Sequence, residues 1–158
     1  MHRGAWGAAE GGGWVSQADE SVATHPLTDE DYRSIADFRA AIRRFLRFSE
    51  ESARSIGLTP QQHQALLAIR GFHGPDRPAV RDLAEALQLR HHSVVGLVDR
   101  LAEAGYVRRM SSPTDNRVVL LAITDHGEEM LDELTGAHIR EQERLSAIVR
   151  ELAGRQQR

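Results

Sequence analysis

Apolar residues recur every three or four positions in several stretches of this 158-residue chain, which is the spacing of a helix with one buried face. The first such stretch covers about residues 29–56. It follows Thr28 and a run of acids, which together are typical of a helix start. Gly57 is the expected residue just beyond its end. One face of this helix is predicted to carry Ile35, Phe38, Ile42 and Phe45.

Three shorter helices are predicted next, each with a local signal. The stretch Thr59-Pro60-Gln61-Gln62 combines a capping threonine, a proline at the first helical position and a capping-box glutamine. The helix that it opens gives way to a loop over 71–78. A short helix over 80–87 and a turn lead to a helix over 91–104, which ends at Gly105. The buried face of this last helix should consist of Val94, Leu97, Val98 and Leu101.

The chain then changes from helical to strand character. Residues 106–110 and 117–123 indicate two strands, joined by a polar turn that contains Pro113 and Asp115. Helix, turn, helix and hairpin together predict a mainly α (α+β) fold: a winged helix-turn-helix with flanking N- and C-terminal helices. The C-terminal helical region begins at about residue 124, and its apolar seam consists of Leu131, Leu134, His138, Leu145, Ile148 and Leu152.

Composition narrows the class of protein. The chain has no Cys, which excludes disulfides, thiolate zinc sites and a thiol switch, and no apolar run approaches the ~20 residues that cross a bilayer. We therefore expect a cytoplasmic protein without a membrane partner. The net charge is -3, yet residues 58–124 hold eight Arg and six acids, a net of +2, which leaves -5 for the remainder. All twenty cations are Arg, so every cationic contact to a phosphate must come from a guanidinium or a His.

The helix over 91–104 is the candidate reader of a DNA major groove. Opposite its buried face, the residues at its N-terminal end are Arg90, His91, His92, Ser93, Val95 and Gly96. Arg90 can bind guanine or a phosphate, the two His can donate to bases or phosphates, and the last two residues allow close approach. Ser93 can contact a phosphate or cap the helix. A metal site at His91 and His92 is the weaker alternative, because adjacent helical residues point about 100° apart, and no metal or cofactor is expected.

The predicted hairpin supplies further candidates. Arg117 ends the turn, where its side chain could enter a narrow minor groove; the alternative is a solvated turn charge. Asp115 in the turn and Asp99 on the preceding helix are the residues that could orient it. Arg108 and Arg109 lie on the first strand, where one should face the DNA backbone and the other should face solvent.

These residues, LRHHSVVGLVDRLAEAGYVRR followed by SPTDNRVVLLAITDHGEEML, resemble the MarR-type (multiple antibiotic resistance) transcriptional regulators. The resemblance runs from about Thr28 to the C-terminus. It implies a homodimer whose two winged modules bind the halves of a palindromic operator in double-stranded DNA. It also implies that Arg117 reaches the minor groove and that Asp99 helps to hold it. The expected domains are then a flexible tail (1–27), a dimerisation helix (28–57), the DNA-binding domain (58–124) and C-terminal dimerisation helices (125–158).

Many members of this family bind phenolic or other aromatic ligands between their dimerisation and DNA-binding domains, so a small-molecule effector is a further expected partner. The residues that could line such a cavity are Phe38, Phe45, Phe48, His63 and Phe72, each of which is also explained as plain core. The chain departs from the family pattern at Val95 and Gly96, where a polar or Arg residue is common. This departure shifts the expected base reading onto Arg90, His91 and His92.

The sequence thus predicts a DNA-binding transcriptional regulator, a homodimeric repressor that an aromatic ligand could release from its operator. One alternative is a winged-helix module that binds other proteins and has no DNA affinity of its own, although the basic character of residues 58–124 favours DNA. An enzyme is disfavoured, because the sequence contains no Gly-rich phosphate loop and no recognisable His/Asp/Ser set. Trp6 and Trp14 leave open an N-terminal arm that docks on a partner subunit instead of a mobile tail.

Overall fold

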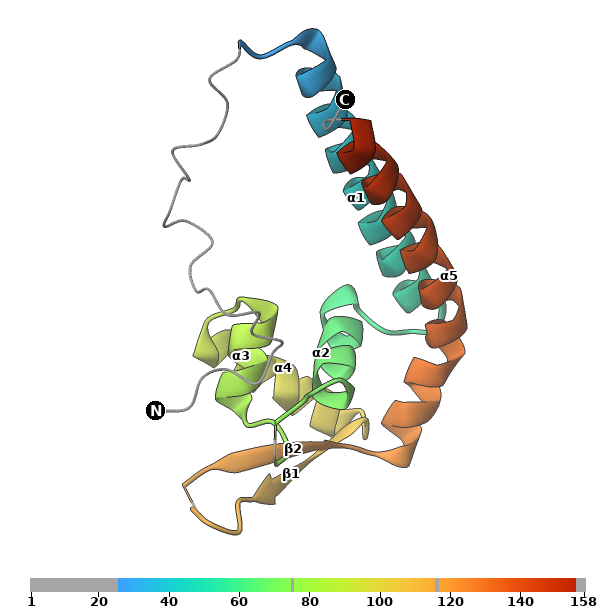
Figure 1. Cartoon of the computed structure of the whole chain (residues 1–158). Coiled ribbons are helices and arrows are strands. Elements are labelled where there is room, and N and C mark those ends of the chain that lie inside the picture. Colours follow the sequence, from blue (N-terminus) through green and yellow to red (C-terminus); the bar gives the residue numbers. More distant parts are fainter. Residues whose placement is uncertain (1–25, 75, 116, 156–158) are drawn as a thin grey trace.

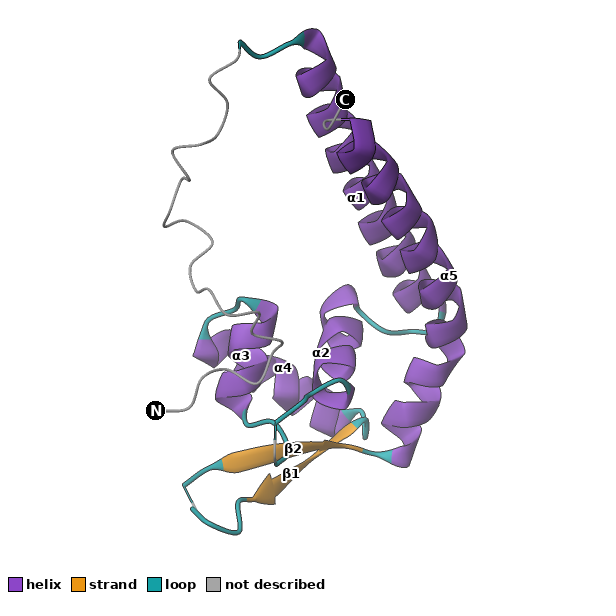
Figure 2. Cartoon of the chain, in the orientation of Figure 1, coloured by secondary structure: helices purple, strands orange, loops and turns teal. Residues whose placement is uncertain are grey.

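The computed structural model describes residues 26–74, 76–115 and 117–155, and the predicted tail with Trp6 and Trp14 falls outside the described residues. Mostly helical structure accompanies one small sheet (Figure 2), which confirms the predicted mainly α fold with a two-stranded wing. In chain order the elements are α1 (Asp29–Ser55), α2 (Pro60–Arg70), α3 (Val80–Leu87), α4 (His91–Glu103), β1 (Val107–Ser111), β2 (Val119–Ile123) and α5 (Asp125–Arg155).

These elements form two groups (Figure 1). The long helices α1 and α5 run side by side, and we call them the α1–α5 pair. Helices α2, α3 and α4 pack on one another and on the two strands at one end of this pair; we call this group the winged unit. Helix α2 also contacts both α1 and α5, so it connects the winged unit to the α1–α5 pair.

Apolar side chains from all three helices of the winged unit and from β2 meet in one core. They include Leu66 of α2, Leu83 of α3 and Leu121 of β2. Burying a side chain of this size stabilises the fold by about 1.5–3 kcal/mol. On α4, the burial of one apolar face leaves the opposite face exposed to solvent. The buried side chains of α4 are the four that the spacing predicts, each at most 1% exposed: Val94, Leu97, Val98 and Leu101.

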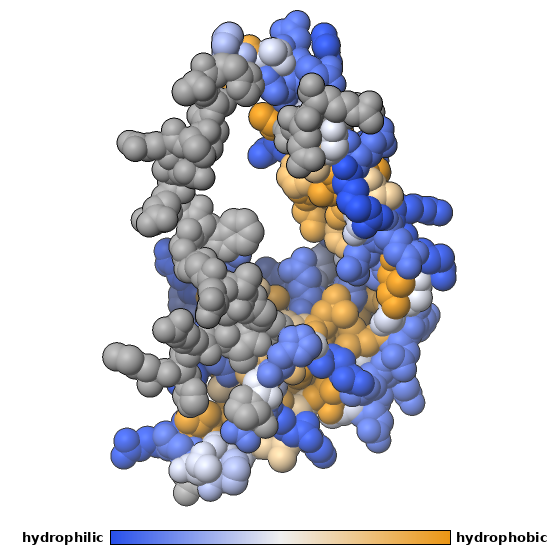
Figure 3. Space-filling view, viewed as in Figure 1, coloured by the Kyte–Doolittle hydropathy of each residue, from blue (hydrophilic) through white to orange (hydrophobic). Residues whose placement is uncertain are grey.

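The apolar face that the sequence predicts for α1 is only partly covered. Ile35 and Phe38 are 54% and 40% exposed, whereas the buried residues of α1 are Ser34, Ala41 and Ala53. Figure 3 shows apolar patches at the surface of the α1–α5 pair, between charged side chains. Helix α5 packs along one side of α1, so part of the apolar face of α1 stays uncovered in the single chain. On α5 the buried members of the predicted seam are Leu131, Leu134 and Leu152.

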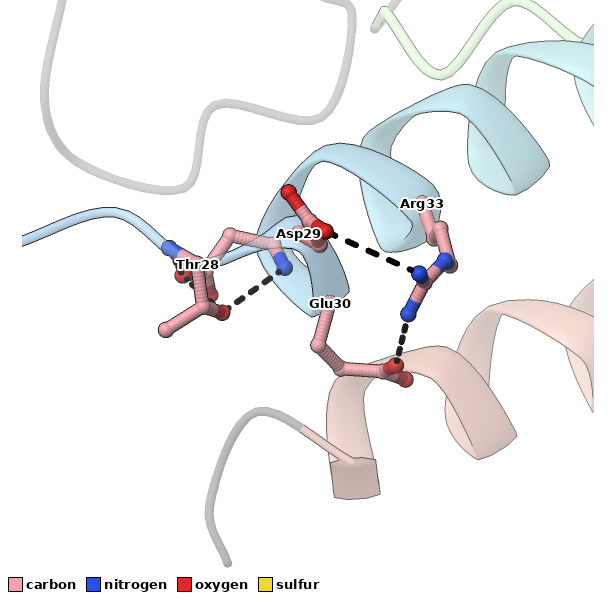
Figure 4. A network of polar contacts seen from close by, with 5 residues as sticks. Thr28, Asp29, Glu30 and Arg33 are labelled. Carbon is pink, nitrogen blue, oxygen red and sulfur yellow. Dashed lines mark hydrogen bonds and ion pairs between the residues drawn. The ribbon is translucent and has the colours of Figure 1, made fainter.

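Local hydrogen bonds determine where α1 begins. Thr28 and Asp31 form a reciprocal capping box, in which the carboxylate of Asp31 accepts the backbone N–H of Thr28 at 2.7 Å. Arg33, one turn later, forms ion pairs with Asp29 and Glu30 (Figure 4). The predicted role of Thr28 as the capping residue is thereby confirmed.

The predicted start of α2 and the predicted ends of α1 and α4 are also confirmed. Gln62 accepts the backbone N–H of Thr59 at 2.9 Å and completes the capping box of α2. Gly57 and Gly105 have φ angles of +86° and +76°. This left-handed conformation carries no Cβ penalty for glycine, so both residues can end a helix without strain.

The two strands are antiparallel and are tied to the segment before α3. Arg109 of β1 pairs with Leu121 of β2. The backbone N–H of Leu121 donates to the carbonyl of Pro78 at 2.8 Å, and Ala79 forms an isolated bridge with Leu120. The sheet is therefore held between α4 and the loop that precedes α3, which places the wing beside both helices.

A close contact joins the wing to α5. The hydroxyl of Thr124 donates to the carbonyl of Gly105 at 2.6 Å and accepts the N–H of Gly127 at 3.1 Å. A Cβ atom on Gly127 would lie 2.3 Å from the carbonyl oxygen of Tyr106 and would overlap it, and glycine avoids this clash because it has no Cβ. The Thr-x-x-Gly spacing thus anchors the start of α5 to the end of α4.

Candidate nucleic-acid interface

The exposed face of α4 carries the side chains predicted to read DNA. Arg90 occupies the N-cap position, and its side chain makes no capping hydrogen bond. Ser93 is the third residue of the helix, so the alternative that Ser93 caps α4 is wrong. The first turn of α4 therefore offers backbone N–H groups that a phosphate could bind. The residues that are exposed or half-buried are Arg90, His91, His92, Ser93, Val95 and Gly96.

A groove of about 480 Å³ lies between α4 and the wing. One wall is formed by His91, Val95 and Asp99, which follow one another at intervals of four residues and therefore share one stripe of the helix. The opposite wall is the end of the wing turn and the start of β2, residues 117–119. The start of α3, with Arg81, contributes to the same groove.

Cationic side chains outnumber acids around this groove. Arg81, Arg109 and Arg117 line it together with His91, and Asp99 is the one acid among the described residues that do so. Small apolar side chains of α3, α4 and β2 supply the rest of the lining. Such a surface suits an anionic partner, such as a row of phosphates, better than a basic or uncharged one.

The structure shows which of the two strand arginines faces α4. Arg109 pairs across the sheet with the buried Leu121, and its guanidinium forms an ion pair with the carboxylate of Asp99. Arg108 is exposed and belongs to the opposite face of the strand, because neighbouring strand residues alternate. Sequence reasoning assigns Asp99 to Arg117, whereas the ion pair that the structure contains joins Asp99 to Arg109.

The wing turn is held by its own hydrogen bonds. The carboxylate of Asp115 accepts the backbone N–H of Arg117 at 2.9 Å, and the Asp115 carbonyl accepts that of Val118 at 2.9 Å. The N–H of Ser112 donates to the carbonyl of Val118 at 3.0 Å and closes the turn. These bonds delay the start of β2 by two residues relative to the prediction. They leave Arg117 exposed at the end of the turn, while Asn116 lies outside the described residues.

Two of the five residues predicted to line a ligand cavity meet where α1, α2 and α5 join. The centroid of the His138 ring lies 5.3 Å from the ring centroid of Phe48 and 4.7 Å from that of His63. Burial, followed by the charge of His138, lowers the pKa of His63 to about 4, so His63 is neutral at neutral pH. In its neutral form, His138 donates from Nδ1 to the carbonyl of Leu134 at 3.0 Å and accepts at Nε2 from the hydroxyl of Ser49 at 3.1 Å.

The other three predicted ligand residues lie outside these ring contacts. Phe38 lines a separate pocket of about 260 Å³ between α1 and the C-terminal part of α5. Phe45 is half-buried on α1, and Phe72 is half-buried beyond the end of α2. Sequence reasoning does not assign His138 and Ser49 to this site, because their spacing indicates only that each lies on a packed helix face.

Comparison with known proteins points to one family. The model of the MarR family matches residues 56–117, from the end of α1 to the wing turn. A Thauera aromatica protein described as a transcriptional regulatory protein for the hcr operon is 31% identical over 109 residues, 69% of this chain and 64% of its own length. The transcriptional repressor MdtR of Bacillus subtilis is 30% identical over 84 residues, 53% of this chain and 52% of its own length. A complex of MepR from S. aureus with DNA has a TM-score of 0.63 at 20% identity, covering 84% of this chain and 92% of that one.

The chain thus spans less than two thirds of the length of the Thauera and MdtR relatives. The likeness to MepR, at 20% identity, concerns the fold. Among the helices that the structure describes, none combines the length and the apolar character needed to cross a bilayer.

Proposed function

We propose that this chain, a MarR-family transcriptional regulator, acts as a homodimeric repressor that binds a palindromic operator. The observation that carries the proposal is the cationic groove between the exposed face of α4 and the wing. Occupation of a promoter by such a dimer would exclude the polymerase, and the repressor MdtR among the relatives supports this direction of regulation.

In the proposed complex, α4 lies in a major groove of the operator. Arg90 binds guanine or a phosphate with its guanidinium, and His91 and His92 donate to bases or phosphates. Ser93 and the free N–H groups of the first helical turn bind a phosphate. The small residues that follow, at 95–96, let the helix approach the base pairs closely.

The wing is proposed to bind the minor groove beside that major groove. Arg117 enters it, at a position where a narrow groove would concentrate negative potential. Asp115 fixes the backbone of Arg117 through the hydrogen bond to its N–H. Of the two strand arginines, Arg109 faces the groove that the DNA backbone would cross, and Arg108, exposed on the outer face of β1, is left to solvent.

The uncovered apolar face of the α1–α5 pair is the proposed dimer interface. Tyr32, Ile35 and Leu46 of α1 are 61%, 54% and 45% exposed, and Ile139 of α5 is 51% exposed. Apolar side chains that gather on one exposed face usually mark an interaction site. With a second copy on this face, residues 28–57 and 125–158 would serve dimerisation and residues 58–124 would serve DNA binding. The two copies of α4 would then lie roughly 34 Å apart, one turn of DNA.

An aromatic effector is proposed to act at the junction of α1, α2 and α5. The ring of His138 already contacts those of Phe48 and His63 there in tilted arrangements, and each of the three residues comes from a different helix. Because α2 connects the winged unit to the α1–α5 pair, a ligand that displaces these rings would change the distance between the two copies of α4 in a dimer.

The decisive experiment is selection of bound duplexes from a random pool with the purified full chain. A palindromic consensus with half-sites one helical turn apart would support the proposal, and light scattering should give twice the chain mass. Absence of any enriched sequence at low salt would contradict it. That result would favour the alternative of a winged-helix module that binds other proteins.

A further inference from the structure

We propose that Asp99 is a specificity-determining residue, because it holds the guanidinium of Arg109 and so withholds that cation from the phosphates of non-operator DNA. The inference rests on the proposed DNA binding and adds a function for the ion pair inside the groove. It concerns sequence discrimination rather than affinity for the operator.

The ion pair between Asp99 and Arg109 lies inside the groove. Asp99 lies on the same stripe of α4 as His91 and Val95, about one turn beyond Val95, and Arg109 reaches it from β1. The two side chains are 48% and 37% exposed, so a phosphate that enters the groove can reach the guanidinium. Ion pairs this exposed add little to the stability of a fold. Stability therefore gives only a weak reason for an acid at this position.

In the proposed complex, a phosphate strand of the DNA crosses this groove. A protein that places α4 in a major groove and Arg117 in the next minor groove must straddle the phosphate strand that separates them. In this chain the space between those two elements is the 480 Å³ groove. Arg109 therefore lies beneath the proposed strand of phosphates, together with Arg81 and Arg117.

The negative charge of Asp99 opposes the binding of phosphates in the groove. As the one acid among the described lining residues, it repels the phosphate strand and neutralises the nearest guanidinium. Phosphate contacts carry no sequence information, so each cation that is free to make them raises affinity for every duplex. By engaging Arg109, Asp99 lowers this general affinity. The pair also links α4 to β1. In the proposed complex only the operator uses both elements for base contacts, so loss of the link offsets the gain in phosphate affinity on the operator alone.

The experiment compares full-length variants on two duplexes of equal length, the selected consensus and a scrambled version of it. The variants are Asp99→Asn, Arg109→Gln, the double variant, and Asp99→Glu, which retains the carboxylate. Glu103→Gln is the matched control, since it removes an exposed acid from the last turn of the same helix, away from the groove. Thermal melting first shows that each variant is folded. Dissociation constants are then measured by fluorescence anisotropy between about 50 and 200 mM salt, a range over which phosphate contacts change affinity strongly.

Asp99→Asn should bind the scrambled duplex roughly fivefold more tightly at 0.1 M salt and should steepen the log–log salt slope by about 0.9 per bound protomer, the effect of one added phosphate contact. The ratio of consensus to scrambled affinity should fall. Arg109→Gln and the double variant should show no steepening, because the cation to be released is gone. Asp99→Glu should resemble the wild type, and Glu103→Gln should change affinity less than about twofold, as expected for a distant screened charge.

An unchanged or shallower slope in Asp99→Asn would overturn the inference, as would a steepening that persists in the double variant. If Asp99→Asn is unfolded at the assay temperature, Asp99→Ser takes its place under the same criteria. A wild type that binds neither duplex in a salt-dependent manner contradicts the proposed function itself. A wild type that binds, with a slope that Asp99→Asn leaves unaltered, contradicts the role of Asp99 alone.

Discussion

Mild acid should destabilise this protein through His63, a side chain of α2 that is 2% exposed. Burial, with a smaller contribution from the charge of His138, lowers its pKa from 6.5 to about 4. Below pH 6.5 the unfolded chain binds a proton at His63, whereas the folded protein does so only near pH 4. The folded state therefore loses stability progressively as the pH falls from 6.5 to 4, and this loss is absent above pH 6.5.

The magnitude follows from the two pKa values. The gap between 6.5 and about 4 corresponds to about 3 kcal/mol of unfolding free energy once the pH is below both values. At pH 5 the unfolded state is almost fully protonated at His63 and the folded state is not, so about 2 kcal/mol is already lost there relative to pH 7.5. This loss is a sizeable part of the stability of an ordinary domain.

Urea unfolding at pH 7.5 and pH 5 measures this effect, at one protein concentration because a dimer would make stability concentration-dependent. Between the two pH values, the wild type should lose about 2 kcal/mol more than His63→Leu, in which the titrating group is absent. His73→Leu, at an exposed position in the loop after α2, is the matched control and should follow the wild type. Equal losses in the wild type and in His63→Leu would refute the assignment of acid sensitivity to His63.

Three further predictions concern the anchor of α5, the wing and the dimer. Gly127→Ala should lower the unfolding free energy by about 1–3 kcal/mol, because its Cβ would overlap the carbonyl of Tyr106. Gly136→Ala, where the nearest atom to a new Cβ is 3.7 Å away, should raise it by about 0.5–1 kcal/mol; two losses of equal size in denaturant melts would contradict this difference in sign. Arg117→Ala should weaken binding to the selected duplex by about 1–3 kcal/mol at matched salt, and an unaltered dissociation constant would remove its assigned role. Ile35→Glu should raise the dissociation constant of the dimer by roughly tenfold or more, measured by sedimentation, and an intact dimer would place the interface elsewhere.

The elements that could be predicted from the sequence are those whose causes are local. The capping boxes at Thr28 and Thr59 and the helix-ending Gly57 and Gly105 act within a few residues of one another, so they can be recognised without a fold. The buried face of α4 follows from helical spacing, and with it the exposure of the residues predicted to read DNA. Sequence alone therefore identified the outward face of α4, on which the residues proposed to read DNA lie.

Which distant residues meet depends on how the helices and strands pack against one another. The sequence predicts Arg117 as the partner of Asp99, whereas the strand register that puts Arg109 opposite Leu121 directs Asp99 to Arg109. His63 and His138 are 75 positions apart, and their contact depends on how α2 packs against the α1–α5 pair. Even the apolar face of α1, which is visible in the sequence, remains partly exposed because a single α5 covers one side of it. Spacing along a chain indicates that a face is apolar, but the packing of the helices decides whether this chain buries that face or leaves it for a partner.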